Sequence, residues 1–263
     1  MGHLELEVKI LNIDVENVRM KIENLGGTFI QSVEQQLYTY DLPTICGRYR
    51  ELLYEILHPE SGIKYMTALD KMKNLLFELD NLMNNEERKQ MNSILSVDNW
   101  KDIFQGKTML EKLSCKEMLD FVEKFQINPN KWIRLRKTNN KITLATKHIL
   151  ANNDTNLQQM LETEIEVSSF EGANDLLIQL GYYFKSYQEK KRLSYRLWDH
   201  QIDLDTWPGI PTYMEIEGNS EEDLNNILEK LGFSISDAIS CTADEVYRIY
   251  GKSMFDSREL KFE

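Results

Sequence analysis

Four segments of this 263-residue chain in which polar and apolar residues alternate carry two acidic residues two positions apart. The pairs are Glu5/Glu7, Glu164/Glu166, Asp203/Asp205 and Glu215/Glu217, and Glu162 extends the second of them. Residues two apart in a β-strand point to the same face, so each pair would place two carboxylates side by side. Carboxylate oxygens are the ligands that Mg²⁺ and Mn²⁺ prefer. A single pair fits a solvated strand face equally well, so a metal site requires several pairs to converge.

Basic residues follow the same alternation on neighbouring segments; they are Lys9, Arg134, Arg136, Lys147, Lys190, Arg192 and Arg196. Lysine and arginine neutralise phosphate oxygens, and arginine does so with two parallel hydrogen bonds. A ligand that suits both signs of charge is a polyphosphate with a divalent cation. The cation would also orient or deprotonate a nucleophile. Positioned charge supplies most of the catalysis in phosphoryl transfer, so no Ser, Cys or His nucleophile is required. Lys147 and Arg196, taken singly, also fit a plain protein surface.

The catalytic candidates are Lys9, Asp203 and Asp205. Asp203 and Asp205 share one face of a strand. One of them is expected to bind the metal or to orient a water molecule, and the other to pair with an arginine.

Alternating polar and apolar residues predict strands at 3–11, 131–137, 141–149, 157–168, 183–198, 201–207 and 212–218, with another extended stretch at 28–42. The faces opposite the charges are largely apolar, as with Leu4, Leu6 and Val8. Tight turns are expected at Asn139-Asn140 and at Asp199-His200, and the second turn would leave His200 exposed.

A strand with paired glutamates is followed three times by an amphipathic helix and then by Leu-Gly, at Leu25-Gly26, Leu180-Gly181 and Leu231-Gly232. Glycine is typical of the position just past a helix. Helices are therefore expected at 14–25, 170–180 and 221–231, and a last one at 243–250. If these helices cover the apolar faces of the strands, the charged faces line either solvent or the inside of a closed barrel. Charges inside a barrel make sense only around a polar ligand, because an unpaired buried ion costs several kcal/mol.

The segment 48–130 differs from the rest because it is rich in Leu, Met, Lys, Glu and Asn and shows helical periodicity at 65–83 and 116–125. It predicts a mostly helical insertion, so that 1–47 and 131–263 form one domain and 48–130 another. The insertion could serve as a lid or as a surface for a protein partner or a homodimer, or it could be decoration.

The composition limits the classes of partner. A net charge of −12 argues against binding to nucleic acids or to anionic membranes, which requires a basic face. Three widely spaced cysteines and four scattered histidines predict neither disulfides nor a thiolate or imidazole metal site. No apolar run approaches the ~20 residues that span a bilayer, and the charged N-terminus does not resemble a signal peptide. We expect a soluble, cytoplasmic protein.

The ordered series of motifs resembles the CYTH superfamily, also called triphosphate tunnel metalloenzymes. The series comprises HLELEVKI with its ExExK signature, RLR, TLATK, TEIEV, EKKR, DLD-x-WPGIP and YMEIEG. The resemblance covers about 3–42 and 131–250, and the long insertion departs from the family pattern. It implies an α+β fold with an eight-stranded antiparallel β tunnel and helices packed outside. It also implies Mg²⁺ or Mn²⁺ on the metal-side candidates Glu5, Glu7, Glu164, Glu166, Glu215 and Glu217, with the phosphates held by Lys9, Arg134, Arg136, Lys147, Lys190 and Arg192.

Three functions fit these motifs. The first is hydrolysis of an inorganic, thiamine or nucleoside triphosphate. The second is an adenylyl cyclase of the class IV type, which would need the same metal and cationic groups and, in addition, a pocket for the base. The third is a non-catalytic protein that binds polyphosphate or a nucleotide, and the repeated carboxylate pairs weigh against it because an anion binder has little use for metal ligands.

Overall fold

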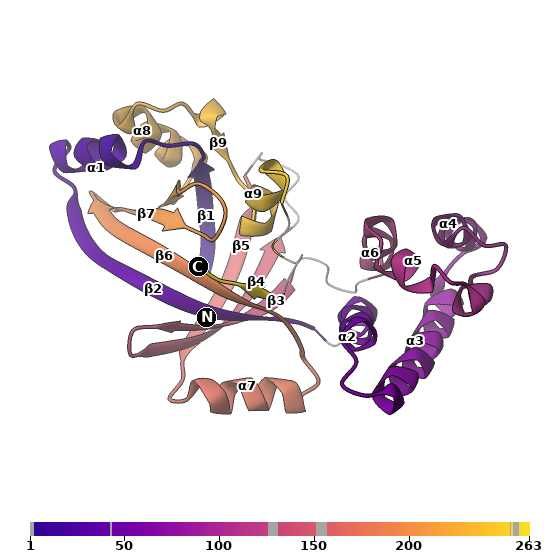
Figure 1. Cartoon of the computed structure of the whole chain (residues 1–263). Helices are drawn as coiled ribbons and strands as arrows, with labels where there is room; N and C mark the ends of the chain where they lie inside the picture. The colour runs from indigo at the N-terminus through magenta and orange to yellow at the C-terminus, as the bar shows by residue number, and fades with distance from the viewer. Residues whose placement is uncertain (1–2, 43, 126–130, 151–156, 253, 255–257) are drawn as a thin grey trace. The chain divides into compact units, whose positions relative to one another are not determined.

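The computed structural model describes the whole chain except residues 1–2, 43, 126–130, 151–156, 253 and 255–257. The chain divides into two compact units. The first unit contains residues 1–40, 130–177 and 185–263, and the second contains 41–129 and 178–184. Figure 1 shows the strands in the first unit and a group of helices in the second.

The first unit is a closed β-barrel. Its strands are β1 (His3–Ile10), β2 (Thr28–Asp41), β3 (Lys131–Thr138), β4 (Lys141–Leu150), β5 (Gln159–Glu166), β6 (Tyr183–Leu197), β7 (His200–Thr206) and β8 (Tyr213–Gly218). They follow one another around the barrel in the order β2-β3-β4-β5-β1-β8-β7-β6, and the β6–β2 and β6–β7 pairings close the ring. The predicted fold class, an eight-stranded antiparallel barrel within an α+β protein, is confirmed.

Two short strands fill places where neighbouring barrel strands stop pairing. Beyond the residues of β1 that pair with β5, β9 (Ala238–Ile239) pairs with Lys9 and Ile10. Next to the part of β6 that precedes its pairing with β7, β10 (Glu259–Leu260) runs parallel to Tyr187 and Gln188. Both additions come from the C-terminal region of the chain and give β1 and β6 partners over more of their length.

Helices cover the apolar outer face of the barrel as the alternation predicted. The helices α1 (Val15–Asn24) and α8 (Glu221–Leu231) lie side by side over β1, β7 and β8 (Figure 1). They bury one apolar cluster whose members from the helices include Val18, Ile22, Leu224 and Ile227. Asp14 caps α1 by accepting a hydrogen bond from the backbone N–H of Asn17. Burial of this face contributes about 1.5–3 kcal/mol for each large aliphatic side chain.

A third helix, α7 (Phe170–Gln179), lies against the outer face of β2. Phe170 contacts the ring of Tyr38 edge to face, with ring centroids 4.8 Å apart, and the hydroxyl of Tyr40 donates to Asn174 at 2.8 Å. After α8 the chain continues through η2 (Ile235–Asp237) to α9 (Ala243–Ile249), which packs on a small cluster around Trp207 and Tyr213.

Each strand–helix repeat ends in a glycine with left-handed backbone. The φ angles are +86° at Gly26, +85° at Gly181 and +80° at Gly232. A residue with a Cβ is strained in this region, whereas glycine is not. The Leu-Gly repeat read from the sequence therefore marks three helix ends of the same kind.

The second unit is helical, as predicted. Its elements are α2 (Ile45–Leu57), α3 (Gly62–Leu82), α4 (Asn85–Leu95), η1 (Trp100–Gln105), α5 (Met109–Ser114) and α6 (Lys116–Glu123). They enclose their own apolar core, which runs from Cys46 to Val122 and includes Met72, Leu76 and Phe121. Within the described residues, no helix combines the length and the apolar character needed to cross a bilayer.

Candidate active site in the barrel

Arg192 lies at the centre of a group of buried ion pairs. Its guanidinium is 2.5 Å from Asp203, 2.6 Å from Asp205 and 2.8 Å from Glu215. Lys190, two residues earlier on β6, lies 2.9 Å from Asp205. The strand register produces this arrangement, because Arg192 is opposite Asp205 and Asp203 is opposite Glu215.

Three carboxylates gather next to this group. One oxygen each from Glu7, Glu215 and Glu217 lies within 4.8 Å of the other two. The amine of Lys9 lies 2.5 Å from Glu7 and 3.2 Å from Glu215, and only 2% of Lys9 is exposed. Glu7 pairs with Glu217 across the strands, and Lys9 pairs with Glu215. Glu7 of the first carboxylate pair thus meets both members of the last pair on an adjacent strand.

A second group of ion pairs lies on β3, β4 and β5. Arg134 contacts Glu162 at 2.6 Å and Glu164 at 3.1 Å, and Arg136 contacts Glu164 at 2.7 Å. Lys147 contacts Glu162 at 2.5 Å. The charges of the two groups act on one another. After burial and Arg134, Arg192 also lowers the pKa of Arg136, and after Lys9 and Arg192, Lys147 also lowers the pKa of Glu215.

The structure brings most of the predicted site residues together in these two groups: Glu7, Lys9, Arg134, Arg136, Lys147, Glu164, Lys190, Arg192, Asp203, Asp205, Glu215 and Glu217. Glu5 lies in β1, and its side chain is outside the described part of the structure. Glu166 and Arg196 are exposed, and Arg196 donates to the backbone oxygen of Asp199 at 3.3 Å. These two residues lie towards strand ends, apart from the ion pairs.

Glu162 is an interior residue that the list of candidates lacked. It is 8% exposed and pairs with both Arg134 and Lys147. The signal was present in the sequence, since Glu162 shares a strand face with Glu164 and Glu166. In this run Glu162 is buried, whereas Glu164 and Glu166 are exposed.

Burial and neighbouring charges move the pKa values of the interior groups in opposite directions. Burial and the nearby Arg192 lower the pKa of Lys190 to about 8, and burial and Arg134 lower that of Arg136 to about 10. Burial also opposes the charge of Lys9, but Glu7 and Glu215 outweigh it and raise the pKa of Lys9. In the same way, Lys9 and Arg192 outweigh burial at Glu215 and hold its pKa well below the usual range.

The donor set of Glu7, Glu215 and Glu217 fits a hard divalent cation such as Mg²⁺ or Mn²⁺. It consists only of carboxylate oxygens, which these ions prefer over nitrogen and sulfur ligands. The cationic groups needed to bind an anionic partner of the metal stand beside it on β1 and β6, in Lys9 and Arg192.

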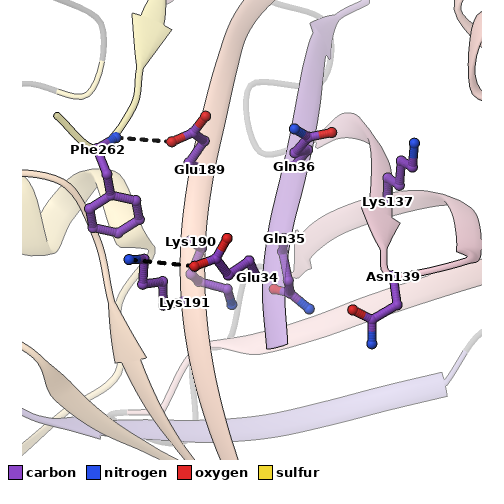
Figure 2. A pocket seen from close by; sticks show the side chains of 9 residues that line it. All are labelled: Glu34, Gln35, Gln36, Lys137, Asn139, Glu189, Lys190, Lys191 and Phe262. Carbon is purple, nitrogen blue, oxygen red and sulfur yellow. Dashed lines mark hydrogen bonds and ion pairs between the residues drawn. The ribbon is translucent and has the colours of Figure 1, made fainter. Parts of the chain in front are cut away.

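A cavity of about 260 Å³ lies elsewhere, beside β2, β6 and the turn after β3 (Figure 2). Two interactions cross or flank it: Lys191 lies 3.5 Å from Glu34, and the backbone N–H of Phe262 donates to Glu189 at 3.0 Å. Glu34 on β2 alternates with the buried Gln35, and Glu189 and Lys191 on β6 alternate with the buried Lys190. Of the predicted site residues, Lys190 alone borders this cavity.

The prediction that His200 is exposed is wrong. The turn lies one residue earlier, at Trp198 and Asp199, and Trp198 takes the left-handed conformation. His200 thus becomes the first residue of β7, where it is 8% exposed and its Nε2 lies 3.0 Å from Asp223 of α8.

No family model matches the sequence, and no curated protein resembles it significantly. Solved structures do share its architecture. The PH1012 protein of Pyrococcus horikoshii OT3 superimposes with a TM-score of 0.51 at 19% identity, over 90% of this chain and 96% of its own. A conserved hypothetical protein of Pyrococcus furiosus gives a TM-score of 0.51 at 17% identity, over 91% and 97%.

A Vibrio parahaemolyticus protein, provisionally named an adenylate cyclase, gives a TM-score of 0.51 at 11% identity, over 94% of this chain and 98% of its own. Identities this low concern the fold alone. The closed eight-stranded antiparallel barrel is the architecture that the motifs led us to expect.

Proposed function

We propose that this protein binds a triphosphate together with Mg²⁺ or Mn²⁺ inside the barrel and hydrolyses it. The observation that carries the proposal is the meeting of Glu7, Glu215 and Glu217 within 4.8 Å, beside Lys9 and Arg192. A barrel interior with this many ions of both signs costs desolvation energy that the ion pairs only partly recover. A polyphosphate with its cation would complete the set of partners.

The residues divide by charge. Glu7, Glu215 and Glu217 would hold the cation, which polarises the phosphate and lowers the pKa of bound water. Lys9, Arg134, Arg136, Lys147, Lys190 and Arg192 would bind phosphate oxygens. Asp203 and Asp205 orient Arg192 through contacts of 2.5 Å and 2.6 Å. The triphosphate would compete with the carboxylates for these cations, so binding is an exchange of ion partners rather than the neutralisation of free charges.

Adenylyl cyclase activity is the second candidate, and the name of the Vibrio parahaemolyticus protein favours testing it. The same metal and cations would then position the ribose 3′-hydroxyl against the α-phosphorus, with pyrophosphate leaving. We place either reaction in the cytoplasm, in line with the three free cysteines of the described structure.

One assay separates these functions. The protein is incubated with ATP or inorganic triphosphate and with Mg²⁺ or Mn²⁺, and the products are resolved by ion-exchange chromatography. Release of orthophosphate supports the hydrolase, whereas cyclic AMP with pyrophosphate supports the cyclase. Tight binding of either ligand without any product would leave a polyphosphate-binding protein and refute the catalytic proposal.

A further inference from the structure

One part of the outer face of the barrel carries no Asp, Glu, Lys or Arg. The charged side chains of β4 and β5 point inwards, where Lys147 pairs with Glu162. Because side chains alternate along a strand, the residues between these charges point outwards. We call the outward set the neutral face, and its members are Ile142, Leu144, Thr146, His148, Leu161, Thr163, Ile165 and Val167.

The neutral face is continuous across the two strands. The strand register sets its residues opposite one another in the couples Leu144–Ile165, Thr146–Thr163 and His148–Leu161. The backbone N–H of Val167 donates to the backbone oxygen of Ile142 at 3.0 Å and extends the series by one more couple. Apolar and β-branched side chains are therefore grouped in one patch.

This patch is accessible in the single chain. Ile165 is 56% exposed and Leu161 is 37% exposed, and Thr146 and Thr163 are exposed as well. An antiparallel sheet that faces water on one side usually carries polar residues on that side. A contiguous exposed patch of apolar residues instead marks a surface for interaction.

The outer face of β2 and β6 shows what this barrel places against solvent. The exposed side chains there include Glu34, Gln36 and Lys191, and Lys191 lies 3.5 Å from Glu34. Other outer faces of the barrel are apolar, and α1, α7 and α8 cover them. The neutral face combines the composition of a covered face with the exposure of an open one, which indicates that it becomes buried on association.

Charge identifies the partner that fits this face. A net charge of −12 makes two copies of the chain repel each other when their charged surfaces approach. A contact related by a two-fold axis uses the same patch on both copies. Two copies can therefore meet at the neutral face without bringing like charges together.

We propose that the neutral face binds the neutral face of a second copy of this chain, so that the protein forms a two-fold dimer through the outer sides of β4 and β5. Sheets pack face to face at about 10 Å with interdigitated side chains. Two strands about 4.8 Å apart offer less area than the roughly 800 Å² that each partner buries in a standard interface. The dimer is therefore weak and reversible. It does not depend on the proposed function, because the ion pairs lie on the opposite side of the same strands.

Sedimentation velocity of the full-length protein tests this contact. The protein should change from monomer to dimer between about 1 and 300 µM, the range in which small interfaces associate. Thr163→Glu and Ile165→Lys each bring two like charges together at the contact, so each should weaken association by at least about 100-fold. The first variant makes the chain more negative and the second makes it less negative, so a change in overall repulsion cannot explain a loss in both.

Ser32→Glu is the matched control, because Ser32 is an exposed residue of β2 and the variant gains the same charge as Thr163→Glu. It should dimerise as the wild type does. Thr163 and Ile165 are exposed in the single chain, so their variants should keep the circular dichroism spectrum and the thermal unfolding of the wild-type monomer.

A wild-type protein that stays monomeric at every concentration would overturn the proposal and assign the neutral face to a partner of another kind. A dimer that both Thr163→Glu and Ile165→Lys leave intact would overturn it as well. So would a dimer that Ser32→Glu disrupts as strongly as Thr163→Glu does.

Discussion

At the scale of single residues, the interior depends on each ion having more than one partner. Arg192 contacts three carboxylates and Glu162 contacts two cations. Removing the sole partner of a buried ion lowers the free energy of unfolding by roughly 3–5 kcal/mol, whereas an ion with several partners keeps part of its stabilisation. This redundancy lets one partner be replaced by a ligand without leaving a bare charge.

Glu215→Gln tests the metal-binding group. The substitution keeps the shape but removes the negative charge that Lys9 and Arg192 share. We expect metal-dependent phosphate release to fall by at least about 100-fold, as for the loss of a group that stabilises the transition state, and Mn²⁺ affinity to fall with it. Calorimetry and a phosphate assay measure both. Glu34→Gln, on the outer face of β2 with a side chain 81% exposed, should change neither. Unaltered Mn²⁺ binding in Glu215→Gln would remove this residue from the metal site.

Lys190 gives a pH dependence with a definite sign. Burial and Arg192 lower its pKa to about 8 from 10.5. The folded protein thus releases this proton before the unfolded chain does, and the contribution of Lys190 to stability increases as the pH rises from about 8 to 10.5. A bound triphosphate favours the charged amine, so binding above about pH 8 should take up a proton and weaken as the pH rises.

Calorimetry in buffers with different ionisation enthalpies detects that proton uptake. In Lys190→Arg the side chain stays charged at every accessible pH, so the uptake assigned to this position should disappear. The same uptake in wild type and variant at pH 8.5 would assign the proton to another group.

Much of the site could be predicted from residue types, because alternation fixes which side chains share a face. Glu7 shares a strand face with Lys9 for that reason, and Glu215 shares one with Glu217, whereas the meeting of the two strands comes from their pairing. How far each strand extends into the barrel depends on pairing between distant segments, which alternation does not encode. Glu162 was omitted from the candidates for this reason, while Glu166 and Arg196 were retained.

At the scale of elements, the three repeats place a glycine in left-handed backbone at each helix end. Gly26 gives the cleanest measurement, since a Cβ at this position would meet no atom within 4 Å. Gly26→Ala should lower the free energy of unfolding by about 1 kcal/mol through backbone strain alone. Gly26→Asn should cost less, because asparagine tolerates this conformation better. Chemical denaturation of both variants checks the order, and equal stabilities would contradict it.

The helices that follow the paired glutamates could be predicted well from the sequence. Their capping residues and the apolar residues of their buried face lie within the same short segment of the chain. Asp14 caps α1, and Gly232 ends α8. The turn before β7 was displaced by one residue because Trp198, not a glycine or asparagine, takes the left-handed conformation there. Tertiary pairing of β6 with β7 determines that turn.

At the scale of the whole molecule, the helical unit has an apolar core of its own, drawn from residues 46–122. We therefore expect that replacing 48–130 by a short linker leaves a folded barrel. Circular dichroism and thermal unfolding of the shortened protein check this. The segment 178–184 needs attention, because it belongs to the helical unit and would lose its neighbours there. An unfolded product would show that the helical unit is required for the barrel to form.

Closure of the ring constrains how the protein is made. The first strand, β1, finds its two neighbours in the barrel about 150 and 210 residues later in the chain, in β5 and β8. During translation it must wait, with its backbone groups unpaired, until β8 has left the ribosome. Nascent chains that stop before Tyr213 would carry an open sheet edge, and such edges aggregate. The helical unit, whose contacts are local, can fold long before that.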